Sequence, residues 1–167
     1  MSAMPDMLPA PVLLDIMVEA SVWLDQADAE ATVRRAIMTA SDQSRIGGEV
    51  CVVLTNDAAI QELNRTWRGI DKPTNVLSFP AGSPVRDADS PTLGDIVIAY
   101  DTTEREALAE GKPFLHHLSH LAVHGFLHLL GYDHQEDGQA EEMERREAEI
   151  LAQLGVPDPY LVSDTTP

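Results

Sequence analysis

The order of strand-like and helix-like segments constrains the fold of this chain more than any other feature. Runs rich in apolar and β-branched residues are typical of strands and occur at residues 12–18, 49–55, 74–79 and 93–100. Helical spacing or a helical start and stop signal marks residues 26–40, 56–67, 101–110, 114–130 and 139–154. Because strands cluster early and helices late, we predict an α+β domain in which a small sheet of about four strands packs with about five helices.

Residues 11–162 are expected to form this one domain, because the sequence contains no repeat and no linker. Residues 1–10 form a Met- and Pro-rich leader that we expect to be poorly ordered, and residues 163–167 form a tail. Asn56 is a good N-cap for the second helix, and Asp101 or Thr102 for the third. Gly131 is placed to end the fourth helix.

The charge of the chain argues against a general nucleic-acid-binding surface. The formal net charge is −17, from 28 acidic residues against 11 Lys and Arg, whereas phosphate binding depends on positive charge. However, Arg65, Arg68 and Lys72 lie in one short stretch, and Arg86 follows in the next loop. A local basic site on an acidic body therefore remains open.

The distribution of cysteine and apolar residues predicts a cytoplasmic protein without a membrane partner. Cys51 is the single cysteine, which excludes an internal disulfide and suits a reducing compartment. No apolar run approaches the roughly 20 residues that span a bilayer. The N-terminus lacks the basic flank and apolar stretch of a signal peptide.

The run HGFLHLLGYDH at residues 124–134 predicts a metal site. His124 and His128 are four residues apart in a predicted helix, so both imidazoles lie on the same face. Gly131 permits a left-handed turn that would bring His134 to the same ion. Three histidine ligands leave a fourth position for water, as in catalytic zinc sites. We expect one zinc ion per chain, although nickel or another divalent ion would suit imidazole as well.

The spacing of this run matches the metzincin protease pattern except at one position. The glutamate that acts as the general base in those proteases is replaced here by Gly125. Peptidase activity by that route is therefore unsupported, although metal-bound water can be acidic enough to react near neutral pH. Asp133 or a metal hydroxide would take the place of the missing base. His120, one turn before His124, is expected to contact substrate or a metal ligand, whereas His116 and His117 are expected to be solvated or structural.

Several blocks of the sequence, in the same order, resemble the YbeY-type endoribonucleases, also called rRNA maturation factors. They are HGFLHLLGYDH, LNRTWRGIDKPTNVLSFP at 63–80, LGDIVI at 93–98, EEMERREAEIL at 141–151, and Pro159-Tyr160. The resemblance implies a small α+β fold with a mixed sheet and a metal-binding helix that carries HxxxHxxGxxH. It also implies a zinc-dependent, single-strand-specific endoribonuclease acting in 16S rRNA 3′-end maturation, small-subunit biogenesis and ribosome quality control. The implied partners are single-stranded RNA, rRNA and the small ribosomal subunit with its proteins.

The resemblance also assigns site residues. It implies His124, His128 and His134 as zinc ligands, with Arg68 and His124 acting in catalysis. From its chemistry alone, Arg68 could bind two phosphate oxygens at once and stabilise charge in the transition state, or it could be a surface residue paired with an acid. Trp67 replaces the family's more usual tyrosine; a base could stack on it, although its spacing from Leu63 favours packing in the core.

Three other functions are compatible with the sequence. The chain could be a metallohydrolase that acts on a peptide or another non-RNA substrate. It could instead be a ribosome-assembly factor with little nuclease activity, in which the metal shapes a binding surface. A purely structural zinc is disfavoured because no fourth protein ligand is evident near the histidines. The sequence leaves open the choice between water and the RNA 2′-OH as nucleophile, as well as the oligomeric state.

Overall fold

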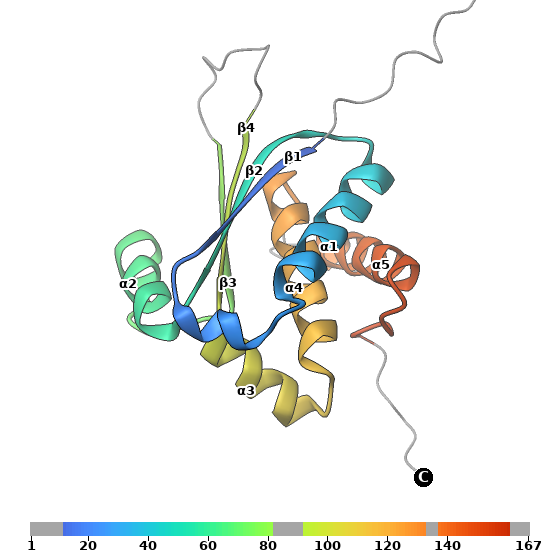
Figure 1. Ribbon diagram of the computed structural model, residues 1–167. Helices are drawn as coiled ribbons and strands as arrows, with labels where there is room; N and C mark the ends of the chain where they lie inside the picture. Colours follow the sequence, from blue (N-terminus) through green and yellow to red (C-terminus); the bar gives the residue numbers. More distant parts are fainter. Residues whose placement is uncertain (1–11, 82–91, 133–136, 161–167) are drawn as a thin grey trace, which may run out of the picture.

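The structure, a computed structural model, describes residues 12–81, 92–132 and 137–160 (Figure 1). Several predictions lie outside these residues: those on the leader 1–10, the tail 163–167, Arg86, Asp133 and the third proposed ligand, His134.

A mixed sheet of four strands forms the centre of the described fold. The strands are β1 (Val12–Val18), β2 (Gly48–Thr55), β3 (Val76–Pro80) and β4 (Thr92–Ala99), in the spatial order β1-β2-β4-β3. β1, β2 and β4 are parallel, and β3 is an antiparallel edge strand on β4. The prediction of a small mixed sheet is therefore confirmed.

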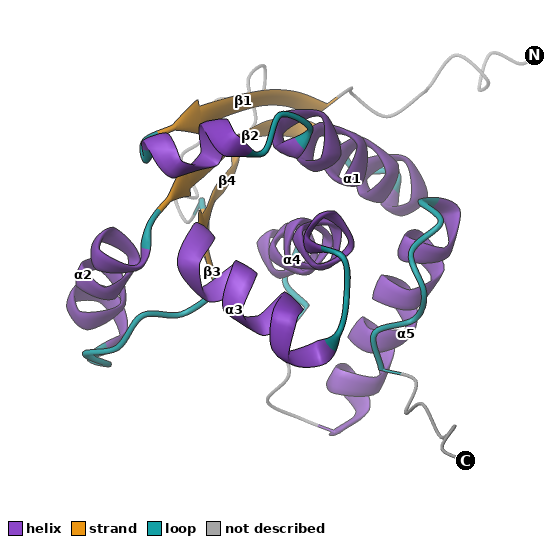
Figure 2. Cartoon of the chain, turned by 60° about the horizontal axis from the view of Figure 1, so that its bottom comes forward, coloured by secondary structure: helices purple, strands orange, loops and turns teal. Residues whose placement is uncertain are grey.

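In the described part of the chain, five α-helices pack around this sheet, as predicted: α1 (Ala29–Ser44), α2 (Asp57–Arg68), α3 (Tyr100–Glu110), α4 (Phe114–Leu129) and α5 (Asp137–Gln153). Figure 2 shows α4 enclosed by the sheet, α1, α3 and α5, whereas α2 lies on the opposite side of the sheet. Within the described ranges, no helix is long and apolar enough to cross a membrane.

The central position of α4 follows from its composition. Leu118, Ala122, Phe126 and Leu127 are fully buried and belong to one large apolar cluster, which also contains residues of β2, β4, α1 and α5. A smaller cluster of Ile60, Leu77, Val97 and Ala99 lies under α2. Because α4 is buried on nearly all sides, its polar side chains need partners inside the protein.

Two predicted helix starts differ from the structure. The first helix begins at Ala29 rather than near Gln26, because a 3-10 helix at Ser21–Asp25 comes first and Gln26 N donates to Trp23 O. α3 begins at Tyr100 with no side-chain cap of its own.

The expected cap residue of α3 instead acts on a different helix. Asp101 accepts a hydrogen bond from the backbone N–H of Asp57 at the start of α2, and Asp57 accepts one from the N–H of Thr102, each at 3.0 Å. The two acids therefore cap each other's helix, a long-range arrangement that local sequence does not reveal. Asn56 caps α2 as predicted, through its bond from Ala59 N at 2.9 Å.

The expected core packing of Trp67 is wrong. Its side chain is 67% exposed and forms an edge-type ring contact with Phe79, with 6.1 Å between ring centroids. The buried face of α2 runs through Ile60 and Asn64 instead. Asn64 is a polar residue that is only 2% exposed. Its side-chain amide donates to the carbonyl of Lys72 at 2.9 Å, and this bond fixes the chain after the helix.

Candidate metal centre

The position of α4 depends on a glycine contact with the sheet. A Cβ at Gly125 would lie 2.8 Å from Ile96 Cγ2 and 3.2 Å from Ser78 Oγ, so no side chain fits there without a shift. The Ser78 hydroxyl donates to the Gly125 carbonyl at 2.9 Å. The residue that replaces the protease glutamate therefore has a packing role against β3 and β4.

Next to this contact, two histidines of α4 come together as predicted from their spacing. The Nε2 atoms of His124 and His128 are 3.1 Å apart. α4 then ends at Leu129 with Leu130 as its C-cap, and Gly131 adopts a positive φ of 102°. The N–H of Gly131 bonds to His128 O at 3.0 Å and that of Tyr132 to Leu127 O at 3.1 Å. The expected turn at Gly131 is thus present, while His134 lies beyond the described segment.

Both histidines line a cavity of about 700 Å³ that also contains Arg68. Its other wall is β3 and the residues before it, from Thr74 to Ser78, together with Pro80, Gly131 and Tyr132. Arg68 is the last residue of α2, is exposed, and forms no ion pair with any residue in the described ranges. The alternative of a surface arginine paired with an acid is therefore unsupported within those ranges. Arg65, one turn earlier, pairs with Glu62.

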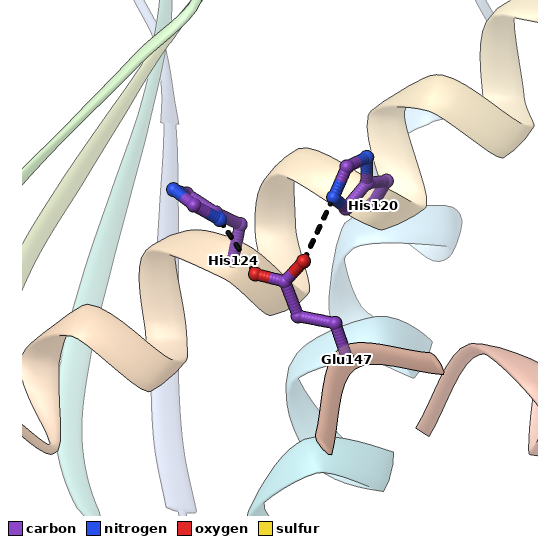
Figure 3. A group of neighbouring side chains, drawn as sticks. All are labelled: His120, His124 and Glu147. Carbon is purple, nitrogen blue, oxygen red and sulfur yellow. Dashed lines mark hydrogen bonds and ion pairs between the residues drawn. The ribbon is translucent and has the colours of Figure 1, made fainter. Parts of the chain in front are cut away.

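The opposite side of His124 faces a buried carboxylate from α5. Figure 3 shows His120 and His124 directed at the carboxylate of Glu147. His124 Nδ1 lies 2.6 Å from Glu147 Oε2, and His120 Nε2 lies 3.0 Å from Oε1. The hydroxyl of Tyr160, beyond the end of α5, donates to the same Oε1. Glu147 is 0% exposed, so these three donors replace its hydration.

These contacts explain the ionisation of Glu147. Burial by itself raises the pKa of its carboxyl group, but the hydrogen bonds from His120 and His124 outweigh that effect and lower the pKa to about 2. Burial and the neighbouring Glu147 raise the pKa of Tyr160, which therefore keeps its proton and donates it in a hydrogen bond. Glu147 is accordingly a buried anion at neutral pH.

His120, His124 and Glu147 form a possible metal-binding group, because one ligand atom of each lies within 4.8 Å of the others. The separations of 2.6 Å and 3.0 Å to Glu147, however, are those of hydrogen bonds in which the imidazole N–H donates. The second ring nitrogen of His124 points away from Glu147 (Figure 3), and this nitrogen is the one close to His128.

The donor set on that second side fits a divalent cation. Two imidazole nitrogens bound to one tetrahedral zinc at about 2.0–2.1 Å would be about 3.3 Å apart, close to the 3.1 Å between the Nε2 atoms of His124 and His128. In addition, the buried charge of Glu147 has no Lys or Arg partner in the part of the chain that the structure describes. A cation bound at His124 would balance this charge.

Sequence reasoning did not identify Glu147 and Tyr160 as residues of the site, although both lie in the blocks that carry the resemblance. One signal was available: on α5, Met143, Ile150 and Leu151 are buried, and Glu147 occupies the same apolar stripe. His120 bonds to Glu147, which is also the partner of the proposed ligand His124. This position beside a ligand is one of the two roles expected for His120, the other being contact with substrate. His117 is buried and bonds to Glu106 at 2.8 Å, which agrees with a structural role.

The fold and the site together define a class of protein, the candidate metal-dependent hydrolases. The features of this class are a small α+β domain, two neighbouring histidines on the central helix, and an arginine that lines the same cavity. Comparison with known proteins identifies the family within it. The model of the family described as endoribonuclease YbeY matches residues 16–155, and the chain belongs to this family. The resemblance seen in the sequence is therefore confirmed.

Individual relatives agree with this result. Endoribonuclease YbeY of Rhodopseudomonas palustris strain BisB18 is 60% identical over 160 residues, which cover 92% of the chain and 95% of the relative. The protein of the same name from Bradyrhizobium sp. strain BTAi1 is 59% identical over 153 residues, covering 87% and 90%. The solution structure of TM1509 from Thermotoga maritima matches with a TM-score of 0.53 and 25% identity, covering 93% of this chain and 99% of that one. Membership of the family supports an endoribonuclease role, which is a hydrolase activity.

Proposed function

We propose that the protein is a zinc-dependent, single-strand-specific endoribonuclease of the cytoplasm that acts in 16S rRNA 3′-end maturation, small-subunit biogenesis and ribosome quality control. Family membership supports the endoribonuclease activity. The observation that carries the proposal is one cavity lined by Arg68, His124 and His128, in which Arg68 has no acidic partner among the described residues. An arginine in that position is available for a phosphate.

His124 and His128 would hold the metal through Nε2, and His134 is proposed as the third ligand. The 3.1 Å separation of these two imidazole nitrogens supports this assignment. When bound, zinc would polarise a phosphate oxygen and increase the acidity of a water molecule. Nickel or another divalent ion would be compatible with the same donors.

The residues of the chain itself would bind and orient the RNA. Arg68 presents planar donors that match two oxygens of the scissile phosphate, and because it lines the same cavity as His124 it would hold that phosphate near the histidines. With a net charge of −17 the chain repels RNA in general. Binding would thus depend on this local site and, as we propose, on contacts with the small ribosomal subunit and its proteins.

The role of Arg68 is tested by cleavage of a defined single-stranded RNA with purified protein. Arg68→Ala should reduce the rate constant by a factor on the order of 10²–10³, as for the loss of one transition-state donor. Arg65→Ala is the matched control, because Arg65 lies one turn away and pairs with Glu62. The variant lacking His124, His128 and His134 serves as the blank for contaminating ribonuclease. Cleavage by Arg68→Ala at the parent rate would contradict the proposal.

Two further measurements separate the alternatives. Metal-dependent turnover of another ester or of a peptide, with RNA left intact, would indicate a metallohydrolase with a different substrate. Co-sedimentation with the small subunit that survives His124→Ala, without cleavage by the parent protein, would indicate an assembly factor. The rRNA 3′ ends in depleted cells, with and without a His128→Ala rescue copy, test the cellular role.

A further inference from the structure

The buried carboxylate of Glu147 is connected to the proposed metal site through a single ring. Its Oε2 meets His124 Nδ1 at 2.6 Å, whereas His124 Nε2 is the nitrogen near His128. The two nitrogens of one imidazole therefore face two environments, a buried anion on one side and the cavity on the other.

This arrangement determines where the ring carries its proton. A carboxylate can only accept hydrogen bonds, so Nδ1 of His124 must be the protonated nitrogen. In a neutral imidazole the other nitrogen, Nε2, then carries the lone pair and no proton, which is the form that binds a metal. The opposite tautomer would direct a lone pair at a buried anion and an N–H at the ion.

The rest of the network holds the carboxylate in place. Its second oxygen, Oε1, accepts from His120 Nε2 at 3.0 Å and from the hydroxyl of Tyr160. His120 is on the same helix as His124, whereas Tyr160 follows α5, so Glu147 is fixed from two elements. The carboxylate cannot rotate away from His124 without losing hydrogen bonds at a position where it is fully buried.

We propose that Glu147 is a positioning residue that fixes the Nδ1–H tautomer and the orientation of His124, and thereby sets the affinity of the protein for its metal. The inference depends on the metal site proposed above and adds a residue from α5 that does not touch the ion. The contrasting arrangement, in which Glu147 is itself a ligand together with His120 and His124, would give a different experimental result.

The first test compares zinc affinity, by competition with a chelator, among four proteins. Glu147→Leu removes the acceptor and should weaken zinc binding about 10- to 100-fold. Glu147→Gln keeps an acceptor oxygen of the same reach and should fall between Leu and the parent. Glu149→Gln is the control, because Glu149 lies on the exposed side of the same helix and pairs with Arg145. Unchanged affinity in both Glu147 variants would overturn the proposal.

A cobalt spectrum distinguishes positioning from direct ligation. If Glu147 positions a ligand, cobalt-loaded Glu147→Gln should keep the band shape of the parent and its stoichiometry of one ion per chain. If Glu147 is a ligand, the bands should shift and the ion should be lost, which would overturn the positioning role.

The third test needs no variant and therefore does not depend on whether Glu147→Leu folds. Nitrogen chemical shifts of the parent protein without metal, at a pH where its imidazoles are neutral, should show His124 protonated at Nδ1 and bare at Nε2. A proton at Nε2 would refute the proposal. None of these measurements uses RNA, so failure of the nuclease assignment leaves their outcome unchanged.

Discussion

The two flanks of α4 meet their neighbours in opposite ways. Toward the sheet, the helix has no side chain at Gly125, and its backbone lies against Ile96 and Ser78. Toward α5, it extends His120 and His124 to a buried carboxylate. One contact is close packing that leaves no room for a methyl group, and the other is a hydrogen-bond network around a fully buried carboxylate.

This difference indicates a division of tasks. The sheet flank fixes where the helix lies, because close packing tolerates little displacement. The α5 flank fixes how one imidazole is turned and which of its nitrogens carries the proton. A substitution on the sheet flank should therefore alter stability, whereas one on the α5 flank should alter stability and metal affinity together.

The largest effect is expected at Gly125. Gly125→Glu would restore the glutamate of the protease pattern, but its side chain would enter the space of Ile96. Overpacking together with a buried unpaired charge should lower the free energy of unfolding by more than about 3 kcal/mol. Urea denaturation measures this loss.

The control is Gly138→Glu on α5, where nothing lies within 4 Å of a new Cβ, and a change of less than about 1 kcal/mol is expected. Equal unfolding free energies of Gly125→Glu and Gly138→Glu would mean that close packing against the sheet does not fix the position of α4.

The second effect concerns acid sensitivity of the α5 flank. The pKa of Glu147 falls from 4.5 to about 2 on folding, so its contribution is present above about pH 4.5 and is lost as the pH falls toward 2. By linkage, the metal-free protein should lose up to about 3 kcal/mol of unfolding free energy over this window. Urea denaturation at successive pH values measures the loss. The unfolding free energy of Glu147→Gln should fall less than that of the parent between pH 4.5 and about 2. An equal fall in both proteins would show that other carboxyl groups are responsible.

The smallest effects come from removing one hydroxyl on each flank. Ser78→Ala deletes the bond to the Gly125 carbonyl, and Tyr160→Phe deletes the bond to Glu147. Each should cost about 1 kcal/mol of unfolding free energy. Zinc affinity should remain unchanged in Ser78→Ala and weaken a few-fold in Tyr160→Phe. The same affinity in both variants would mean that the α5 flank is only structural.

Much of the fold could be predicted from local patterns. The β-branched runs predicted the four strands, and the turn after α4 followed from Gly131, because each signal lies within a few residues of its effect. The pairing of His124 with His128 was likewise predictable, since helical spacing alone brings them together.

What the sequence could not reveal depends on contacts between distant segments. Nothing near Asp101 indicates that it caps α2, which begins 44 residues earlier in the chain. The spacing of Trp67 from Leu63 suggested the core, but the docking of α2 on the sheet buries Asn64 instead. Glu147 lies in an acidic stretch, where a charged residue is usually solvated, and only the three-dimensional fold brings it to His124.

The position of Glu147, 23 residues after His124, has a consequence for biosynthesis. A ribosome makes α4 before α5, so a nascent chain carries the paired histidines before it has the carboxylate and Tyr160. On our proposal, such an unfinished chain would hold zinc weakly, and tight metal loading would come only with the last helix. A nascent enzyme that cuts RNA would thereby acquire its full metal affinity only when its own synthesis is nearly complete.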